Sequence, residues 1–172
     1  AAATNGHLDI LQFVLEKYPF IFEQFDQDNH SVLDAAVISD TLATVRFLVE
    51  KYEASKYDWR QGVRTAIEFD RLNILKYFID EKKCDVDGPQ EQPLVFLAVG
   101  CQHRDIIQYL VEEKKVNLTM LDYNKENILF EAVRKNDLDF MKEILDEKKI
   151  GLDINWRNWD GETLVHVASC AN

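Results

Sequence analysis

The stretch DYNKENILFEAVRKNDLDFMKEILDEKK, residues Asp122–Lys149, contains two short helical patterns that follow each other directly. The first is marked by Leu129, Ala132 and Val133. The second has the three- and four-residue spacing of an amphipathic helix, at Leu138, Met141, Ile144 and Leu145. Two helices this short cannot bury both of their apolar faces on each other. The stretch therefore predicts a helix–turn–helix unit that needs neighbours of its own kind.

The rest of the chain supplies such neighbours, because the same pattern recurs along its whole length. One alanine of each unit, which we call the reference alanine, returns at intervals of 30 to 36 residues: Ala2, Ala36, Ala66, Ala98, Ala132 and Ala168. Large apolar residues stand three residues before it, nine after it, and in pairs twelve and thirteen after it. A period in this range is typical of a solenoid of repeated units. We expect the small alanine to let the second helix approach the first, and the paired large residues to fill the groove between units.

These recurring positions resemble the ankyrin-repeat family. The best matches are NGHLDILQFVL (Asn5–Leu15), ENILFEAVRKNDLDFMKEIL (Glu126–Leu145) and DGETLVHVA (Asp160–Ala168). The resemblance covers the whole chain and implies an all-α repeat solenoid, with ankyrin-type helix-turn-helix units joined by β-hairpin-like fingers. The units expected are 26–55, 56–87, 88–121 and 122–157, with incomplete units at 1–25 and 158–172. A tetratricopeptide or HEAT array is the alternative, against which the fingers and the ankyrin-like positions of Thr163 and His166 argue.

The fingers are expected at the polar stretches that precede each helix pair. They are Asp26–Ser31, Lys56–Gln61, Gly88–Pro93, the residues from Asp122 to Glu126, and Asp153–Glu162. The second departs most from the family pattern, because Trp59 and Gln61 stand where Gly and Thr are usual. Helix caps are expected at Ser31, Asn127 and Thr163. We expect Trp59 and Trp156 to pack between fingers, and Phe20, Phe22 and Phe25 to pack under their loop.

Composition limits the class of partner and the compartment. The chain has 172 residues, 47% of them hydrophobic, and a formal net charge of −11. This charge argues against nucleic acid and anionic membranes as partners, and no apolar run is long enough for membrane insertion. The three cysteines (84, 101 and 170) lie far apart, so reduced thiols in a cytoplasmic compartment are expected, with secretion into a host cytosol as an alternative. We expect a chain that is monomeric by itself and, since it begins and stops inside first helices, a piece of a longer array or of a larger protein.

Catalytic motifs are absent from the sequence. There is no Gly-rich phosphate loop, GxSxG, HExxH or kinase-like set, so we expect no enzyme activity, no cofactor and no metal. The family resemblance implies turn-forming roles for His7, His103 and His166. One acid recurs fourteen residues after the reference alanine and is followed by lysines: Glu16, Glu50, Asp80, Glu112 and Asp146. We interpret these positions as a solvated convex edge, with a charged stripe for a partner as the alternative.

The resemblance implies binding on a concave face made of the fingers and the inner side of the first helices. The partner-binding residues expected there are Tyr57, Asp58, Arg60, Glu68, Phe69, Tyr123, Asn124, Glu126, Arg134, Lys135, Trp159 and Asp160. Aromatic and arginine side chains are enriched among the residues that dominate binding energy. The function expected is that of a non-enzymatic module that binds a protein or peptide. The alternative is a regulatory or targeting array within a larger enzyme, channel or secreted effector.

Overall fold

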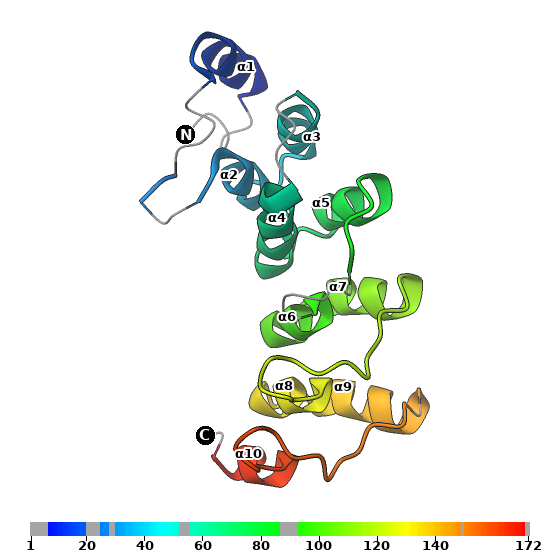
Figure 1. Cartoon of the computed structure of the whole chain (residues 1–172). Coiled ribbons are helices and arrows are strands. Elements are labelled where there is room, and N and C mark those ends of the chain that lie inside the picture. Colours follow the sequence, from blue (N-terminus) through cyan, green and yellow to red (C-terminus); the bar gives the residue numbers. More distant parts are fainter. Residues whose placement is uncertain are drawn as a thin grey trace. The chain divides into compact units, whose positions relative to one another are not determined.

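A computed structural model of the chain describes residues 7–19, 25–27, 30–51, 56–86, 93–148 and 150–170 (Figure 1). The regular secondary structure of these residues is helical throughout, and they include no strand. The chain divides into two compact parts, Ala1–Cys84 and Asp85–Asn172. We call them the N-terminal segment and the C-terminal segment and describe each by itself.

The N-terminal segment consists of short helices arranged in pairs. Its helices are α1 (Leu8–Lys17), α2 (Val32–Ile38), α3 (Leu42–Lys51), α4 (Lys56–Glu68) and α5 (Leu72–Lys76), which continues as a π-helical turn over Tyr77–Glu81. Helix α2 packs against both α3 and α4, and α5 packs against both α3 and α4. First helices therefore lie beside first helices and second helices beside second helices, which is the packing of stacked repeats.

The C-terminal segment repeats this arrangement. Its helices are α6 (Leu94–Cys101), α7 (Arg104–Gln108, continued by a π-helical turn over Tyr109–Glu113), α8 (Ile128–Arg134), α9 (Leu138–Lys142, continued over Glu143–Glu147) and α10 (Leu164–Cys170). Helix α8 packs between α6 and α10, as Figure 1 shows, while α7 pairs with α6 and α9 with α8. The predicted all-α repeat solenoid is confirmed.

The core follows the columns predicted from the sequence. The reference alanines Ala36, Ala66, Ala98 and Ala132 are fully buried, and so are most large residues at their related positions, such as Leu33, Leu48 and Leu110, whereas Met141 and Leu145 are half-buried. Ala168 differs, because it lies in α10 with its side chain exposed. A methyl group at the buried positions leaves room for the paired helix, so the small residue is a packing requirement of each helix pair.

Polar side chains and unusual backbone angles fix the helix ends. Ser31 and Asp34 form a reciprocal capping box on α2, and the Asn127 side chain accepts from the backbone N–H of Leu129 on α8, as expected. Four residues after each buried reference alanine, the backbone turns through the left-handed region. The residues there are Asp40, Asp70, Gln102 and Asn136, with φ between 53° and 60°. The turn between paired helices is therefore left-handed even though no glycine occupies it.

The prediction of a finger at Lys56–Gln61 is wrong, because α4 begins at Lys56 and runs through it. The fingers that the structure describes each have Asp or Asn ten residues before the reference alanine, at Asp26, Asp122 and Asn158. The side-chain oxygen of that residue accepts the backbone N–H four residues later and closes the loop. Lysine at position 56 has no such oxygen, so the segment continues as helix. Trp59 consequently lies half-buried in α4 and not between fingers.

Two further expectations concern loops. Residues 88–92 of the expected third finger lie outside the described residues, and Pro93 directly precedes α6. Phe20 and Phe22 also lie outside them. Phe25 is 62% exposed, so the expectation that it packs under its loop is wrong. The neighbouring Asp26 and Gln27 are exposed as well and provide no apolar cover.

Candidate functional site

The fingers are short loops closed by two opposed hydrogen bonds. In the finger Asp122–Glu126, the Asp122 N–H donates to the Glu126 carbonyl (2.9 Å), and the Glu126 N–H donates to Asp122 Oδ1 (2.8 Å). The finger Asn158–Glu162 has the same two bonds, at 3.0 and 2.9 Å. Its fourth residue, Gly161, has a positive φ, as has Lys125 in the other finger. These bonds give the hairpin-like end expected from the sequence, without a strand.

The two fingers of the C-terminal segment dock on each other through two tryptophans. The Trp159 backbone N–H donates to the Asn124 carbonyl (3.0 Å), and its indole N–H donates to the Tyr123 carbonyl (3.1 Å). The indole N–H of Trp156 donates to the Lys125 carbonyl (2.6 Å), so the expectation that Trp156 packs between fingers is confirmed. Both indoles are thereby fixed by backbone groups.

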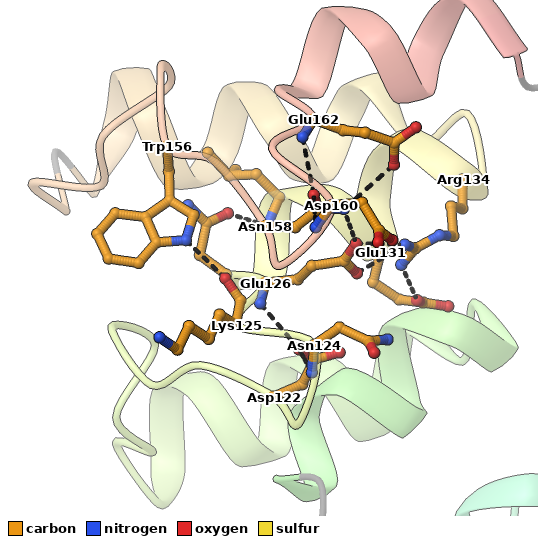
Figure 2. A network of polar contacts seen from close by, with 12 residues as sticks. Asp122, Asn124, Lys125, Glu126, Glu131, Arg134, Trp156, Asn158, Asp160 and Glu162 are labelled. Carbon is orange, nitrogen blue, oxygen red and sulfur yellow. Dashed lines mark hydrogen bonds and ion pairs between the residues drawn. The ribbon is translucent and has the colours of Figure 1, made fainter.

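A buried carboxylate connects both fingers to α8 (Figure 2). Glu126 is only 2% exposed; its carboxylate accepts from Asn158 Nδ2 (2.9 Å) and Arg134 Nη2 (2.6 Å). Partial burial of Arg134 lowers its pKa by disfavouring the charged guanidinium. Hydrogen bonds and electrostatic attraction from Glu126 and Glu131 outweigh this effect, so the pKa of Arg134 is raised. Glu126 therefore has no oxygen turned to solvent. The prediction that it contacts a partner is wrong, because its carboxylate is used to hold Arg134 and Asn158.

The outer side of the same fingers is exposed and aromatic. Tyr123 is 76% exposed and Trp159 is 66% exposed. The Lys125 ammonium lies 3.9 Å from the centroid of the Trp159 ring, a cation–π contact. We call Tyr123, Lys125, Arg157, Trp159 and Asp160 the finger surface. Exposed Arg134 and Lys135 lie at the end of α8, and Asn124 lies half-buried within its finger.

The sequence-predicted residues of the N-terminal segment are arranged differently. Tyr57 and Asp58 lie in α4, and their side chains are outside the described part of the chain. Arg60 and Glu68 are exposed on the same helix. Phe69 is partly exposed and meets the His30 ring edge-on, with 6.4 Å between ring centroids. The structure therefore brings Tyr123, Asn124 and Trp159 together in the C-terminal segment, whereas among the predicted residues of the N-terminal segment it shows the contact of Phe69 with His30.

The recurring acids pair with lysines of the following unit. Glu16 pairs with Lys51, Glu50 with Lys82 (3.7 Å) and Glu112 with Lys148 (3.5 Å), and all six side chains are partly exposed. Exposed pairs of this kind stabilise a protein by about 0–1 kcal/mol each. The solvated edge expected from the sequence therefore also carries ion pairs between successive units.

Three residues of the site were not expected from the sequence: Lys125, Arg157 and Asn158. Lys125 covers the Trp159 ring, Arg157 donates to the Gly161 carbonyl (2.6 Å), and Asn158 connects the fingers. The sequence did contain a signal for Asn158, because it stands ten residues before a reference alanine, as Asp26 and Asp122 do. The expected turn role of His166 is confirmed, since its Nδ1 accepts from the Thr163 N–H (3.3 Å).

The described ranges contain no group of three or more His, Cys, Asp or Glu side chains that could hold a metal ion. No helix in the described part of the chain has the length and apolar character needed to cross a bilayer. Burial raises the pKa of the Cys84 thiol, which keeps it protonated at neutral pH.

Comparison with known sequences shows a distant similarity to a toxin. No family model matches the chain. Alpha-latrocrustotoxin-Lt1a of Latrodectus tredecimguttatus is 23% identical over 171 residues, which cover 90% of this chain and 12% of the toxin. The chain thus spans about an eighth of the length of the curated relative that it matches.

Comparison with solved structures gives the fold. The ankyrin repeat domain of Bcl-3 matches 98% of this chain and 77% of its own, with a TM-score of 0.69 and 22% identity. A chain in the complex of the Bdellovibrio bacteriovorus predatory endopeptidase Bd0816 with immunity protein Bd3460 matches 99% of this chain and 89% of its own, also with a TM-score of 0.69 and 22% identity. With its stacked helix pairs, buried alanine positions and hairpin-like fingers, the protein has the ankyrin-repeat fold.

Proposed function

We propose that this chain is a non-enzymatic protein-interaction module that binds a protein or peptide on the concave face of its repeats, with the finger surface as the main anchor. The observation that carries the proposal is the exposure of Tyr123 and Trp159 on fingers held by hydrogen bonds. Large aromatic side chains at a surface are the residues that most often dominate binding energy. Here the Trp159 indole is held by the Tyr123 carbonyl before any partner arrives, which lowers the entropy lost on binding.

Two features of the surroundings support this reading. The buried Glu126 carboxylate is paired within the protein with Arg134 and Asn158, so the loops keep their conformation without a ligand. Lys125, over the Trp159 ring, and Arg157, which is bonded to the Gly161 carbonyl, provide polar groups on the same fingers as the rings. A protein interface usually combines an aromatic centre with a polar rim of this kind.

The test is affinity capture from a lysate of the source cells, or of the host if the source is a parasite, followed by quantitative mass spectrometry. Wild type is compared with the double variant Tyr123→Ala/Trp159→Ala. The matched control is Ile10→Ala/Phe13→Ala, which removes exposed apolar surface of similar size from α1. Circular dichroism must show all three proteins folded.

We expect at least one protein to be captured by wild type and by the α1 control but lost from the finger variant. A partner that the finger variant captures equally well would remove the finger surface from the proposal. A partner lost only from the α1 control would move the binding site to the exposed apolar side of α1.

A second candidate function is a regulatory or targeting array within a larger enzyme, channel or secreted effector. It is supported by the toxin relative, in which the matched stretch is 12% of the length. The intact mass of the native protein, detected with an antibody against this chain, distinguishes the two. A native mass well above the 20.1 kDa of this chain favours the array within a larger protein.

A further inference from the structure

We propose that the finger surface takes an acidic segment of a partner protein that carries an aromatic or proline ring. The inference rests on the proposed function and adds the chemistry of the partner. It is unexpected from the composition, because a chain with a net charge of −11 would by itself favour a basic partner.

The rings of the finger surface offer apolar area and no indole donor. The Trp159 N–H is already used by the Tyr123 carbonyl, so a partner meets the face and edge of the indole only. Tyr123, on the neighbouring finger, adds a second, largely exposed ring. Such a pair stacks best on a flat, rigid apolar group, and aromatic and proline rings meet this demand at low cost in conformational entropy.

The exposed charges around these rings are mostly positive. Lys125 and Arg157 are exposed, against one exposed acid of the finger surface, Asp160; Arg134 is exposed as well but is ion-paired with Glu126 and Glu131. The remaining acids of Asp122–Glu126, Asn158–Glu162 and α8 are buried or half-buried and accept hydrogen bonds from inside the protein: Asp122 from two backbone N–H groups, Glu126 and Glu131 from Arg134, and Glu162 from Asn158. A partner therefore meets ammonium and guanidinium groups first and the carboxylates behind them.

A basic segment is disfavoured at this surface for a second reason. The Lys125 ammonium already occupies a face of the Trp159 ring, at 3.9 Å from its centroid. A lysine or arginine of a partner would have to displace it or lie beside it as a like charge, which weakens binding. A carboxylate placed next to the stacked ring instead pairs with Lys125 or Arg157. One segment can satisfy both features of the surface when an acid is adjacent to its ring residue.

The experiment is selection of a displayed library of short random peptides on the wild-type chain, with counter-selection on Tyr123→Ala/Trp159→Ala. We expect the enriched peptides to combine Asp or Glu with a neighbouring Trp, Phe, Tyr or Pro. Their affinities, measured by fluorescence anisotropy, should fall roughly tenfold in Lys125→Glu/Arg157→Glu and rise in Asp160→Lys. The control Lys17→Glu/Lys142→Glu makes the same charge change at exposed lysines of α1 and α9 and should leave the affinities unchanged.

Each other outcome contradicts the inference. Enriched peptides that are basic or uncharged, or affinities insensitive to the charge reversal at Lys125 and Arg157, would overturn the acidic partner while leaving the binding surface in place. Peptides that bind Tyr123→Ala/Trp159→Ala as tightly as wild type would overturn the peptide site, and so would a selection without enrichment. The lysate capture then tests the proposed function independently. A labelled single-stranded oligonucleotide that binds wild type and is released by the same variants would replace the protein segment with a nucleic acid.

Discussion

Asn158 connects the two C-terminal fingers by using both ends of its side-chain amide. Its Nδ2 donates to the buried Glu126 carboxylate at 2.9 Å, and its Oδ1 accepts the N–H groups of Asp160 and Glu162. Asp122, at the equivalent position of the preceding finger, accepts two N–H groups in the same way. The amide is therefore required for the contact between fingers and not for the closure of its own finger.

This relationship predicts that Asn158→Asp destabilises the protein, although the aspartate keeps the side-chain oxygen that accepts the backbone N–H groups of its finger. The change removes the donor to Glu126 and places a carboxylate beside Glu126 and Glu162. We expect a loss of about 1–3 kcal/mol in the free energy of unfolding at neutral pH, measured by urea denaturation. The loss should shrink as the pH falls, because protonation removes the repulsion between carboxylates.

The matched control is Asp122→Asn, which keeps an acceptor oxygen at the other finger and removes no hydrogen-bond donor. It should change stability by less than about 0.5 kcal/mol. Equal losses in the two variants, or a loss in Asn158→Asp that is independent of pH, would contradict the role assigned to the amide.

A second prediction concerns the reference alanines. Ala132→Leu adds three carbon atoms at a fully buried position, where α8 meets its neighbours. Overpacking of this kind should lower the free energy of unfolding by about 1–3 kcal/mol. Ala168→Leu makes the same change at the equivalent but exposed position in α10 and should have little effect. Unchanged stability of Ala132→Leu would refute the repeat register.

Tyr77 gives a third prediction at neutral pH. Its ring is 2% exposed, and its hydroxyl has no hydrogen-bond partner among the described residues. A buried polar group without a partner costs stability, so Tyr77→Phe should raise the free energy of unfolding by about 1 kcal/mol. Tyr123→Phe, at an exposed ring, should leave stability unchanged. A destabilised Tyr77→Phe protein would show that the hydroxyl has an unrecognised partner.

The same residue predicts a pH dependence at the alkaline end. Burial, followed by the charge of Glu50, raises the pKa of Tyr77 to about 12 in the folded chain, against about 10 for an unfolded tyrosine. Since the folded state favours the neutral form, this contribution to stability is complete below pH 10 and is lost as the pH rises towards 12. Tyr77→Phe should therefore show a shallower decline in thermal midpoint between pH 10 and 12. Parallel declines in both proteins would argue against the shift.

A fourth prediction concerns the left-handed turn after the second helix of a pair. Lys115 is exposed, has φ of 53°, and directly precedes Val116, whose N–H donates to the Leu110 carbonyl. A side chain is unfavourable at such an angle, so Lys115→Gly should stabilise the protein by up to about 1 kcal/mol. Lys115→Ala removes the same charge but keeps the Cβ atom and should show no gain. A gain of equal size in both would attribute the effect to charge.

The exposure of Tyr123 and Trp159 could be foreseen, because the family resemblance implies that their finger positions face solvent. The role of Glu126 could not be foreseen, since its burial depends on Arg134 eight residues later and on Asn158 thirty-two residues later. The wrong prediction of a finger at Lys56 has a different cause. The absence of an Asp or Asn side-chain oxygen at this position was visible in the sequence. That a finger needs this oxygen became clear only from a comparison of the three closed loops.

The sequence by itself determined the repeat and the helix pairs of this protein, because a small residue and large apolar residues at fixed spacing can be buried together in few ways. It also determined the positions of the caps at Ser31 and Asn127, which act on backbone groups nearby. The tertiary structure decided which polar residues face a partner. Exposure and pairing depend on contacts between units some thirty residues apart, such as Asn158 with Glu126 and Trp159 with Tyr123. Local sequence patterns do not predict contacts over such separations in the chain.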